Sequence, residues 1–225
     1  MAKKKVTKED QNLENVQEAL STTSAWIEKN QNKLTWAITI IVAVVVGVLA
    51  LNTYVIKPKA VEVSNENAKA VTYFMQGDWE KALNGDDAEC IGFQAIADEY
   101  KYLQGGKLAA LYAGVCYYQL GQYEDAVVYL GKFSAKDLNI EPAALQLLGD
   151  AYVQMEEYSK AVKVFEAAAN SGNEIIAPMS LMKAGKVYLE LGNKAAAKKT
   201  FETIKTQYPT SAEAQDADKY IAIAE

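Results

Sequence analysis

The chain has no histidine, and its 23 basic residues are all lysine, so arginine is missing as well. Without imidazole, the Ser-His and Cys-His nucleophile systems and every histidine-containing metal site are excluded. Without guanidinium, the two-pronged recognition of carboxylates is also excluded. The 29 acidic residues give a net charge of -6, whereas nucleic-acid binders carry a surplus of positive charge. These absences favour a protein that binds other proteins over an enzyme or a nucleic-acid binder.

Proline and cysteine are scarce too. Four prolines against 14 tyrosines favour helices with flat side chains filling the gaps between them. Cys90 and Cys116 are too few and too far apart for a zinc site, and they either form a disulfide or pack as small buried hydrophobes. We favour the second interpretation. Because no Walker loop occurs and Asp86-Asp87 lacks the spacing of a calcium loop, we predict no catalytic, cofactor-binding or metal-binding residue.

One long uncharged run is present, from Leu34 to Ile56. Its 23 residues exceed the ~20 that a helix needs to cross a ~30 Å hydrocarbon core. Trp36 and Tyr54 stand near its ends, where aromatic rings prefer the headgroup level. The polar segment before the run is too long for a signal peptide, and no cysteine follows directly for lipidation. We therefore predict an uncleaved transmembrane helix over residues 34–56.

The charges around this run bear on its orientation. Residues 1–33 hold six lysines and five acidic residues. The two lysines of this segment that lie closest to the run are nearly balanced by Lys57 and Lys59 on its other side, so the nearest charges do not decide the orientation. Long domains translocate largely regardless of charge, and a long acidic region follows. We expect residues 1–33 to be a polar cytoplasmic tail. The remainder is then periplasmic, anchored in the cytoplasmic (inner) membrane of a bacterium.

The tail contains a short helical pattern. Leu13, Val16, Leu20 and Ile27 fall on one face of a helix, which the poor helix formers of residues 21–24 interrupt. Two interpretations stay open: a marginal helix that frays in water, or a docking or dimerising segment.

Beyond Pro58 the sequence repeats itself every 35 or 36 residues. Small residues on the first helix of each unit let a second helix approach closely, alanines on the second helix do the same, and larger apolar side chains fill the remaining space. The recurring positions are Gly114, Gly149 and Gly185; Ala126, Ala161 and Ala197; Leu130, Phe165 and Phe201; and Pro142 and Pro178.

This period and these positions resemble the tetratricopeptide repeat family, which is built from antiparallel helix pairs. The resemblance implies an all-α fold in which a transmembrane helix precedes a right-handed α-solenoid of about four helix pairs and a C-terminal capping helix. Glu156 departs from the pattern at the turn glycine, and Lys194 at an aromatic position. Within a repeat domain over residues 57–225, we expect repeats near 60–106, 107–141, 142–177 and 178–209, and a cap at 210–225.

The first repeat is harder to place than the others. Phe93, Ile96 and Tyr100 match later positions of the second helix, so we predict that helix from Asp87 to Leu103. A turn signal at Gly77 and another before Asp86 predict a helix before Gly77 and an irregular insertion through about Asp86.

An anchor followed by repeats resembles the ancillary subunits of the bacterial Sec translocon. This resemblance implies a non-enzymatic, membrane-anchored scaffold or chaperone-like module, whose partners are a membrane complex such as the translocon and unfolded or extended client segments. An alternative is a structural subunit that binds through its transmembrane helix and tail, with the repeats as spacer or dimer interface. An organellar import receptor with cytosolic repeats also fits the layout, but this chain lacks the basic clamp expected of such a receptor. Homo-oligomerisation is left open.

In the resembled family the first helices of each pair line a concave groove. The corresponding side chains here are mostly apolar or amide, and Lys186 is the single cation, which disfavours a clamp for C-terminal carboxylates. Such a surface suits an extended or helical peptide, and the alternative is that these residues merely pack between helices. The predicted protein-binding groove comprises Leu111, Val115, Tyr118, Gln119, Gln146, Asp150, Val153, Gln154, Met182, Lys186, Leu189 and Glu190.

Overall fold

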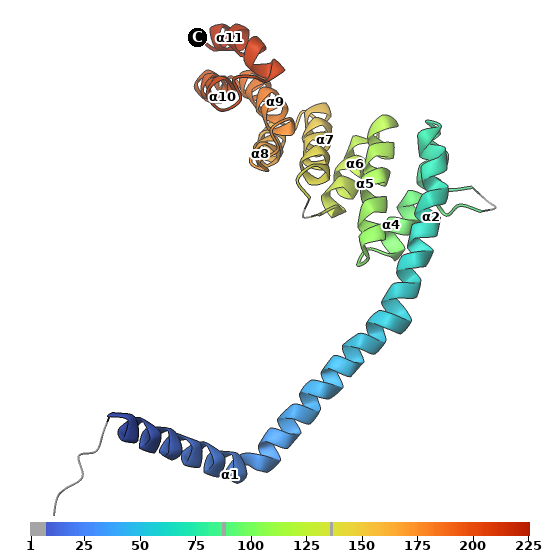
Figure 1. The fold of residues 1–225 in the computed structure, drawn as a ribbon. Helices are drawn as coiled ribbons and strands as arrows, with labels where there is room; N and C mark the ends of the chain where they lie inside the picture. The colour runs from blue at the N-terminus through green and yellow to red at the C-terminus, as the bar shows by residue number, and fades with distance from the viewer. Residues whose placement is uncertain (1–7, 87–88, 136) are drawn as a thin grey trace, which may run out of the picture. The chain divides into compact units, whose positions relative to one another are not determined.

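The computed structural model describes residues 8–86, 89–135 and 137–225, and all regular elements in these ranges are helices (Figure 1). The chain divides into two compact units, Met1–Pro58 and Lys59–Glu225. The predicted all-α class is confirmed, with one long apolar helix followed by stacked helix pairs.

The described residues of the first unit are all helical. Helix α1 runs from Lys8 to Leu51, and a π-helix, η1, continues it from Asn52 to Ile56. Its apolar part is the one stretch of the described residues that is long and apolar enough to cross a membrane. None of the 18 most apolar consecutive residues of this helix is buried, whereas the core helix of a soluble protein would be mostly buried.

The predicted interruption of the tail helix is absent. The Ser24 hydroxyl donates to the Ser21 carbonyl at 3.0 Å, which is compatible with helical backbone, and α1 continues through both residues. On the predicted face, Leu20 and Ile27 are 64% and 47% exposed. The side chains of Leu13 and Val16, like the lysines of residues 3–5, lie outside the described part of the chain.

The second unit consists of helices in which each pair contacts the next, as the yellow to red ribbons of Figure 1 show. Pairs α5–α6, α7–α8 and α9–α10 follow one another, and α11 packs against both α9 and α10. The helices are α2 (Lys57–Met75), α3 (Trp79–Asn84), α4 (Gly92–Glu99), α5 (Gln104–Gln119), α6 (Tyr123–Lys132), α7 (Ile140–Gln154), α8 (Tyr158–Ala169), α9 (Ile176–Glu190), α10 (Lys194–Gln207) and α11 (Ala212–Ala224).

The recurring glycines sit where the two helices of a pair touch. A Cβ atom added to Gly149 would lie 2.5 Å from Phe165 Cε1, and one added to Gly185 would lie 2.4 Å from Phe201 Cε1. At Gly114 the nearest atom is Leu130 Cγ, at 2.6 Å. These distances are shorter than van der Waals contact, so the predicted close approach of the helices is confirmed.

The start of the repeat domain differs from the prediction. Helix α4 is shorter than the expected helix over residues 87–103, and residue 87 lies outside the described ranges. The predicted irregular insertion contains α3, because Asp78 caps its N-terminus by accepting from the Lys81 N–H at 3.2 Å and Leu83 is buried. Gly85, with φ 86°, follows the last residue of α3. Local capping thus forms a helix where the turn signals indicated none.

The other end of the domain matches the prediction of a terminal helix. The Ser211 hydroxyl caps α11 by accepting from the Ala214 N–H at 3.1 Å. Ala217 is fully buried, and Tyr220 stacks on Phe201 of α10 with ring centroids 5.2 Å apart. Helix α11 therefore covers the apolar face that the last pair would otherwise expose.

Candidate protein-binding surfaces

The predicted groove lies on α5, α7 and α9, the first helices of the three regular pairs. Its members differ in exposure, which separates those that a partner could contact from those that pack inside. Met182 is only 7% exposed and packs in the cluster of Phe201 and Ala197, so it is a packing residue. The exposed members are Gln119, Gln154, Lys186 and Glu190, and the half-buried ones are Leu111, Val115, Tyr118, Gln146, Asp150, Val153 and Leu189.

Two polar contacts join α7 to α9 at this face. The Lys183 ammonium donates to Asp150 Oδ1 at 2.7 Å, and both side chains are about one-third exposed or less. Gln146 Nε2 donates to the Ser180 hydroxyl at 3.3 Å. Two of the predicted groove residues therefore hold neighbouring repeats together. Lys183 was not predicted because it lies one position outside the groove register, and only the packing of α7 on α9 brings it to Asp150.

Tyr118 connects α5 to this face. Its ring meets that of Tyr123 edge-on at 5.5 Å, and it packs against the core of the first repeats. Burial raises the pKa of the Tyr118 hydroxyl, and the nearby charges of Asp150 and Tyr123 add to the rise. The hydroxyl therefore stays protonated at neutral pH and can donate a hydrogen bond to a bound chain.

Lys186 belongs to the predicted groove but interacts with the capping helix. Its ammonium lies over the Tyr220 ring, 4.8 Å from the centroid. A cation held over an aromatic face is attracted electrostatically by the ring quadrupole. Lys186 therefore fixes the end of the stack as well as contributing charge to the groove.

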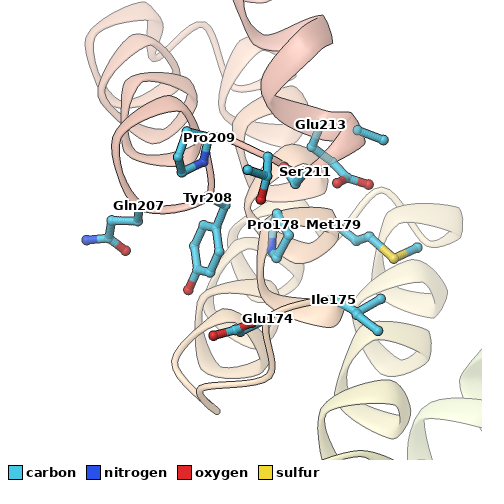
Figure 2. Close-up of a pocket in the computed structure, with 11 residues that line it drawn as sticks. Glu174, Ile175, Pro178, Met179, Gln207, Tyr208, Pro209, Ser211 and Glu213 are labelled. Atoms are coloured by element: carbon cyan, nitrogen blue, oxygen red, sulfur yellow. The ribbon is translucent and has the colours of Figure 1, made fainter.

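One pocket lies away from the groove, beside the helix connections (Figure 2). It has a volume of ≈ 550 Å³ and opens between the α8–α9 loop, the start of α9 and the α10–α11 connection. Pro178 and Tyr208 line it together with Ile175, which is 75% exposed, and Met179, which is 38% exposed. Polar and apolar side chains line it in about equal measure, and the described residues hold no cluster suited to metal binding.

A related pocket of ≈ 450 Å³ lies one repeat earlier. It is lined by Leu138, which is 69% exposed, and by Pro142, the counterpart of Pro178. Asn173 bridges the two loops, because its amide nitrogen donates to the Leu138 carbonyl at 2.9 Å and its amide oxygen accepts from the Ile176 N–H at 2.8 Å. We call the exposed apolar residues of these two loops and the helix starts that follow them the loop edge: Leu138, Ile140, Ile175 and Met179.

The loop edge was missed by the sequence argument. Its signal was present, since Leu138 follows Asp137 and Ile175 comes two positions after Asn173, and the two polar loop residues are 36 positions apart. Asp137 Oδ1 accepts from the Ile140 N–H at 2.6 Å, as Asn173 does in the next loop, so each polar residue orders its own loop. The pattern looked like ordinary turn chemistry.

Both cysteines are buried and unbridged, in agreement with the favoured interpretation. Burial raises the pKa of the Cys116 thiol to about 12, and burial also raises that of Cys90. Thiols with raised pKa values and no access to solvent are unreactive. They contribute packing to the first repeats.

Three segments of the chain match family models of the tetratricopeptide repeat, over residues 108–137, 142–171 and 179–211. These segments cover most of the pairs α5–α6, α7–α8 and α9–α10 described above. The C-terminal region contains tetratricopeptide repeats. No curated protein matches the chain. Tetratricopeptide repeat domains are usually non-catalytic and serve protein–protein interaction, and no enzyme family matches, so the repeats suggest protein partners.

Proposed function

We propose that the chain is a single-pass, non-enzymatic membrane protein whose tetratricopeptide repeats bind client or partner proteins on the extracytoplasmic side, as a scaffold or chaperone-like component of a membrane complex such as the Sec translocon. The observation that supports it is the combination of an apolar helix with exposed side chains and a repeat domain with its own buried core.

In this proposal the anchor keeps the repeat domain at the membrane, where its partners are. A single transmembrane helix holds the binding surface within a thin layer at the membrane, and this raises its effective concentration toward other proteins in the same layer. Weak contacts then suffice for capture, because the second binding event is nearly intramolecular. This mechanism suits short-lived contacts with proteins that emerge or assemble at the membrane.

The first helices offer the contacts that an extended chain needs. Gln119 and Gln154 are exposed at corresponding positions of α5 and α7, and each amide can donate to and accept from a peptide backbone. Val115 and Val153 beside them are half-buried and supply apolar contact. Apolar and amide side chains bind without demanding one sequence, which favours varied client segments.

Photo-crosslinking in living cells tests this surface. A crosslinker at Gln119 or Gln154 is expected to capture proteins of the membrane complex and its clients. Matched controls are Val128 on α6 and Lys163 on α8, exposed positions on the second helices. Equal capture from both sets of positions would refute a groove on the first helices.

Truncation and protease protection test the anchor. Removing residues 1–58 should leave a helical protein that no longer associates with the membrane complex. Added protease should cleave the repeat domain in spheroplasts and leave residues 1–33 protected. If the truncated form co-purifies with the same complex unchanged, tethering is not the mechanism.

The second candidate, a structural subunit that binds through its apolar helix, is favoured by one observation. Ala43 and Gly47 are four residues apart on α1, and nothing lies within 4 Å of a Cβ added to Gly47. Small residues at this spacing allow close contact between transmembrane helices. Replacing residues 34–56 with an unrelated apolar helix separates the candidates, because loss of the complex with intact repeats supports the structural role.

A further inference from the structure

A second type of surface lies at the start of the repeat domain, where the turn after α4 meets the beginning of α5 and the end of α6. It is a pocket of ≈ 460 Å³ with a floor of small residues, Ala97, Gly106 and Ala110, all buried. Gly106 keeps the floor tight, because a Cβ there would lie 2.0 Å from the Tyr100 carbonyl oxygen. The remaining residues that line the pocket are Asp98, Lys101, Tyr102, Lys107 and Lys132.

The single carboxylate of this pocket already has two hydrogen-bond partners. Asp98 Oδ1 accepts from the Lys132 ammonium at 2.8 Å, and Asp98 Oδ2 accepts from the Tyr129 hydroxyl at 2.8 Å. Burial opposes ionisation of Asp98, but the hydrogen bonds from Lys132 and Tyr129 outweigh it and the pKa of the carboxyl is lowered. Asp98 is thus ionised at neutral pH and occupied by these two partners.

Of the other two lysines, Lys101 has its ammonium over the Tyr102 ring, 5.1 Å from the centroid. Within the described residues, neither Lys101 nor Lys107 forms an ion pair. The pocket therefore has three ammonium groups for one carboxylate, in a region, residues 59–225, where 16 lysines face 24 acidic residues for a net charge of -8. A local surplus of positive charge inside an acidic domain is complementary to an anion.

Two features indicate which anion fits. Tyr102, at the rim, is 86% exposed, and exposed aromatic rings prefer the headgroup level of a membrane. Tyr100 lies two positions before Tyr102, and its hydroxyl interacts with Glu62. Glu62 is only six residues after Ile56, the last residue of the apolar run. This contact joins the turn that carries Tyr102 to a residue that is close along the chain to the end of the apolar run. Lysine also binds phosphate well as a point charge without the fork of arginine.

We propose that this pocket binds the phosphate of an anionic phospholipid headgroup. The proposal rests on the apolar helix spanning the membrane. Lys101 and Lys107 supply the charge, Tyr102 contacts the interface, and the floor of small residues admits the headgroup. Headgroup binding would hold the first repeat at the membrane surface in spite of the acidic character of the domain.

The first experiment measures affinity. Phosphatidylglycerol is titrated into the full chain in detergent, and bound lipids are counted by native mass spectrometry. The Lys101→Gln/Lys107→Gln variant should bind the lipid about thirty-fold more weakly, as expected for two lysines near an anionic surface. The control variant Lys163→Gln/Lys199→Gln removes two exposed lysines of α8 and α10 and should bind as the wild type does. Equal affinity of all three proteins would overturn the proposal.

The second experiment locates the contact. The full chain is inserted into nanodiscs of phosphatidylcholine alone or with phosphatidylglycerol, and amide hydrogen exchange is followed over residues 97–110. We expect slower exchange in the anionic discs, lost in Lys101→Gln/Lys107→Gln and retained in the control. If the chain inserts but exchange is the same in both discs, the headgroup site is wrong and the anchor stands. If the chain does not insert, the anchor and the headgroup site both fail.

Neutral discs with added inorganic phosphate complete the test. Slowing of exchange there, equal to that in anionic discs, would show a site for soluble anions and overturn the lipid proposal. A peptide with a free C-terminal carboxylate, added to neutral discs, separates a protein ligand in the same way. The proposal requires that neither addition reproduces the effect of the anionic lipid.

Discussion

The two units of this chain are both rich in apolar residues, but they use them differently. In α1, Ile41 and Val48 are 62% and 59% exposed, while in the repeats Phe165 and Phe201 are at most 1% exposed. The first unit depends on length and absence of charge, which many sequences satisfy. The second depends on shape, because each large side chain fills a space left by a glycine. Mean hydropathy describes neither population.

Removing a large side chain should affect the two units very differently. Phe165→Ala deletes a buried ring that packs against Gly149, and the free energy of unfolding of the repeat domain should fall by about 4 kcal/mol. Ile41→Ala in α1 should leave that free energy unchanged. Urea denaturation of the full chain in detergent, followed by circular dichroism, measures both. Equal effects would mean that the repeat core tolerates voids as an exposed helix does.

Introducing a charged side chain should affect the apolar helix strongly and the surface of the repeats hardly at all. Val45→Lys puts an ammonium near the middle of the apolar run, and it should shift the insertion equilibrium of the helix by about 3 kcal/mol toward the aqueous state. Val128→Lys, at a 53% exposed position of α6, should change neither insertion nor folding. An insertion assay with a topology reporter gives the comparison. Unaltered insertion of Val45→Lys would remove the main support for a transmembrane span.

Adding a single methyl group at a glycine should also affect the two units differently. Gly185→Ala places a Cβ 2.4 Å from the fully buried Phe201 ring and should lower the free energy of unfolding by about 2 kcal/mol. Gly47→Ala has nothing within 4 Å and gains helix propensity, so the thermal midpoint should not fall. Thermal denaturation compares the two variants. A stable Gly185→Ala would show that the helix pair can open without cost.

The smallest effect concerns backbone conformation in a turn. Glu156 has φ 57°, where the corresponding turns use Gly121 and Gly192. Glu156→Gly should raise the free energy of unfolding by about 1 kcal/mol, because a side chain is strained in this conformation. Gly192→Ala, at φ 69°, should lower it by a similar amount. Stabilisation by both changes, or by neither, would contradict a strained turn.

The regular repeats could be predicted from the sequence because each copy supports the others. Gly149 alone would be one glycine in a helix, but with Gly114 and Gly185 at the same step it marks a contact between helices. The first repeat has no such support, since α3 interrupts the register and its cap at Asp78 is a local feature. The repeat spacing therefore cannot predict the helices of a repeat that departs from that spacing.

The candidate surfaces were predicted less completely, for a related reason. Helical spacing identifies which residues share a face, but it does not show that Met182 packs beneath its neighbours or that Lys183 reaches Asp150. The lysine pocket needs three segments of the chain: the end of α4 with the turn after it, the beginning of α5 and the end of α6. Such convergence depends on tertiary packing, and none of the three segments has a distinctive sequence.

Among the described residues of the repeat domain, most of the buried ones gather in three clusters, and Tyr188 packs against the two smaller clusters. The largest extends from Val63 to Ala151, and the two smaller ones are centred on Phe165 and Phe201. Because neighbours stabilise only neighbours in such a stack, loss of the last pair removes little support from the first. Under mechanical load or heat, the domain should come apart from its free end inward, in steps, so the part next to the apolar helix is the last to be lost.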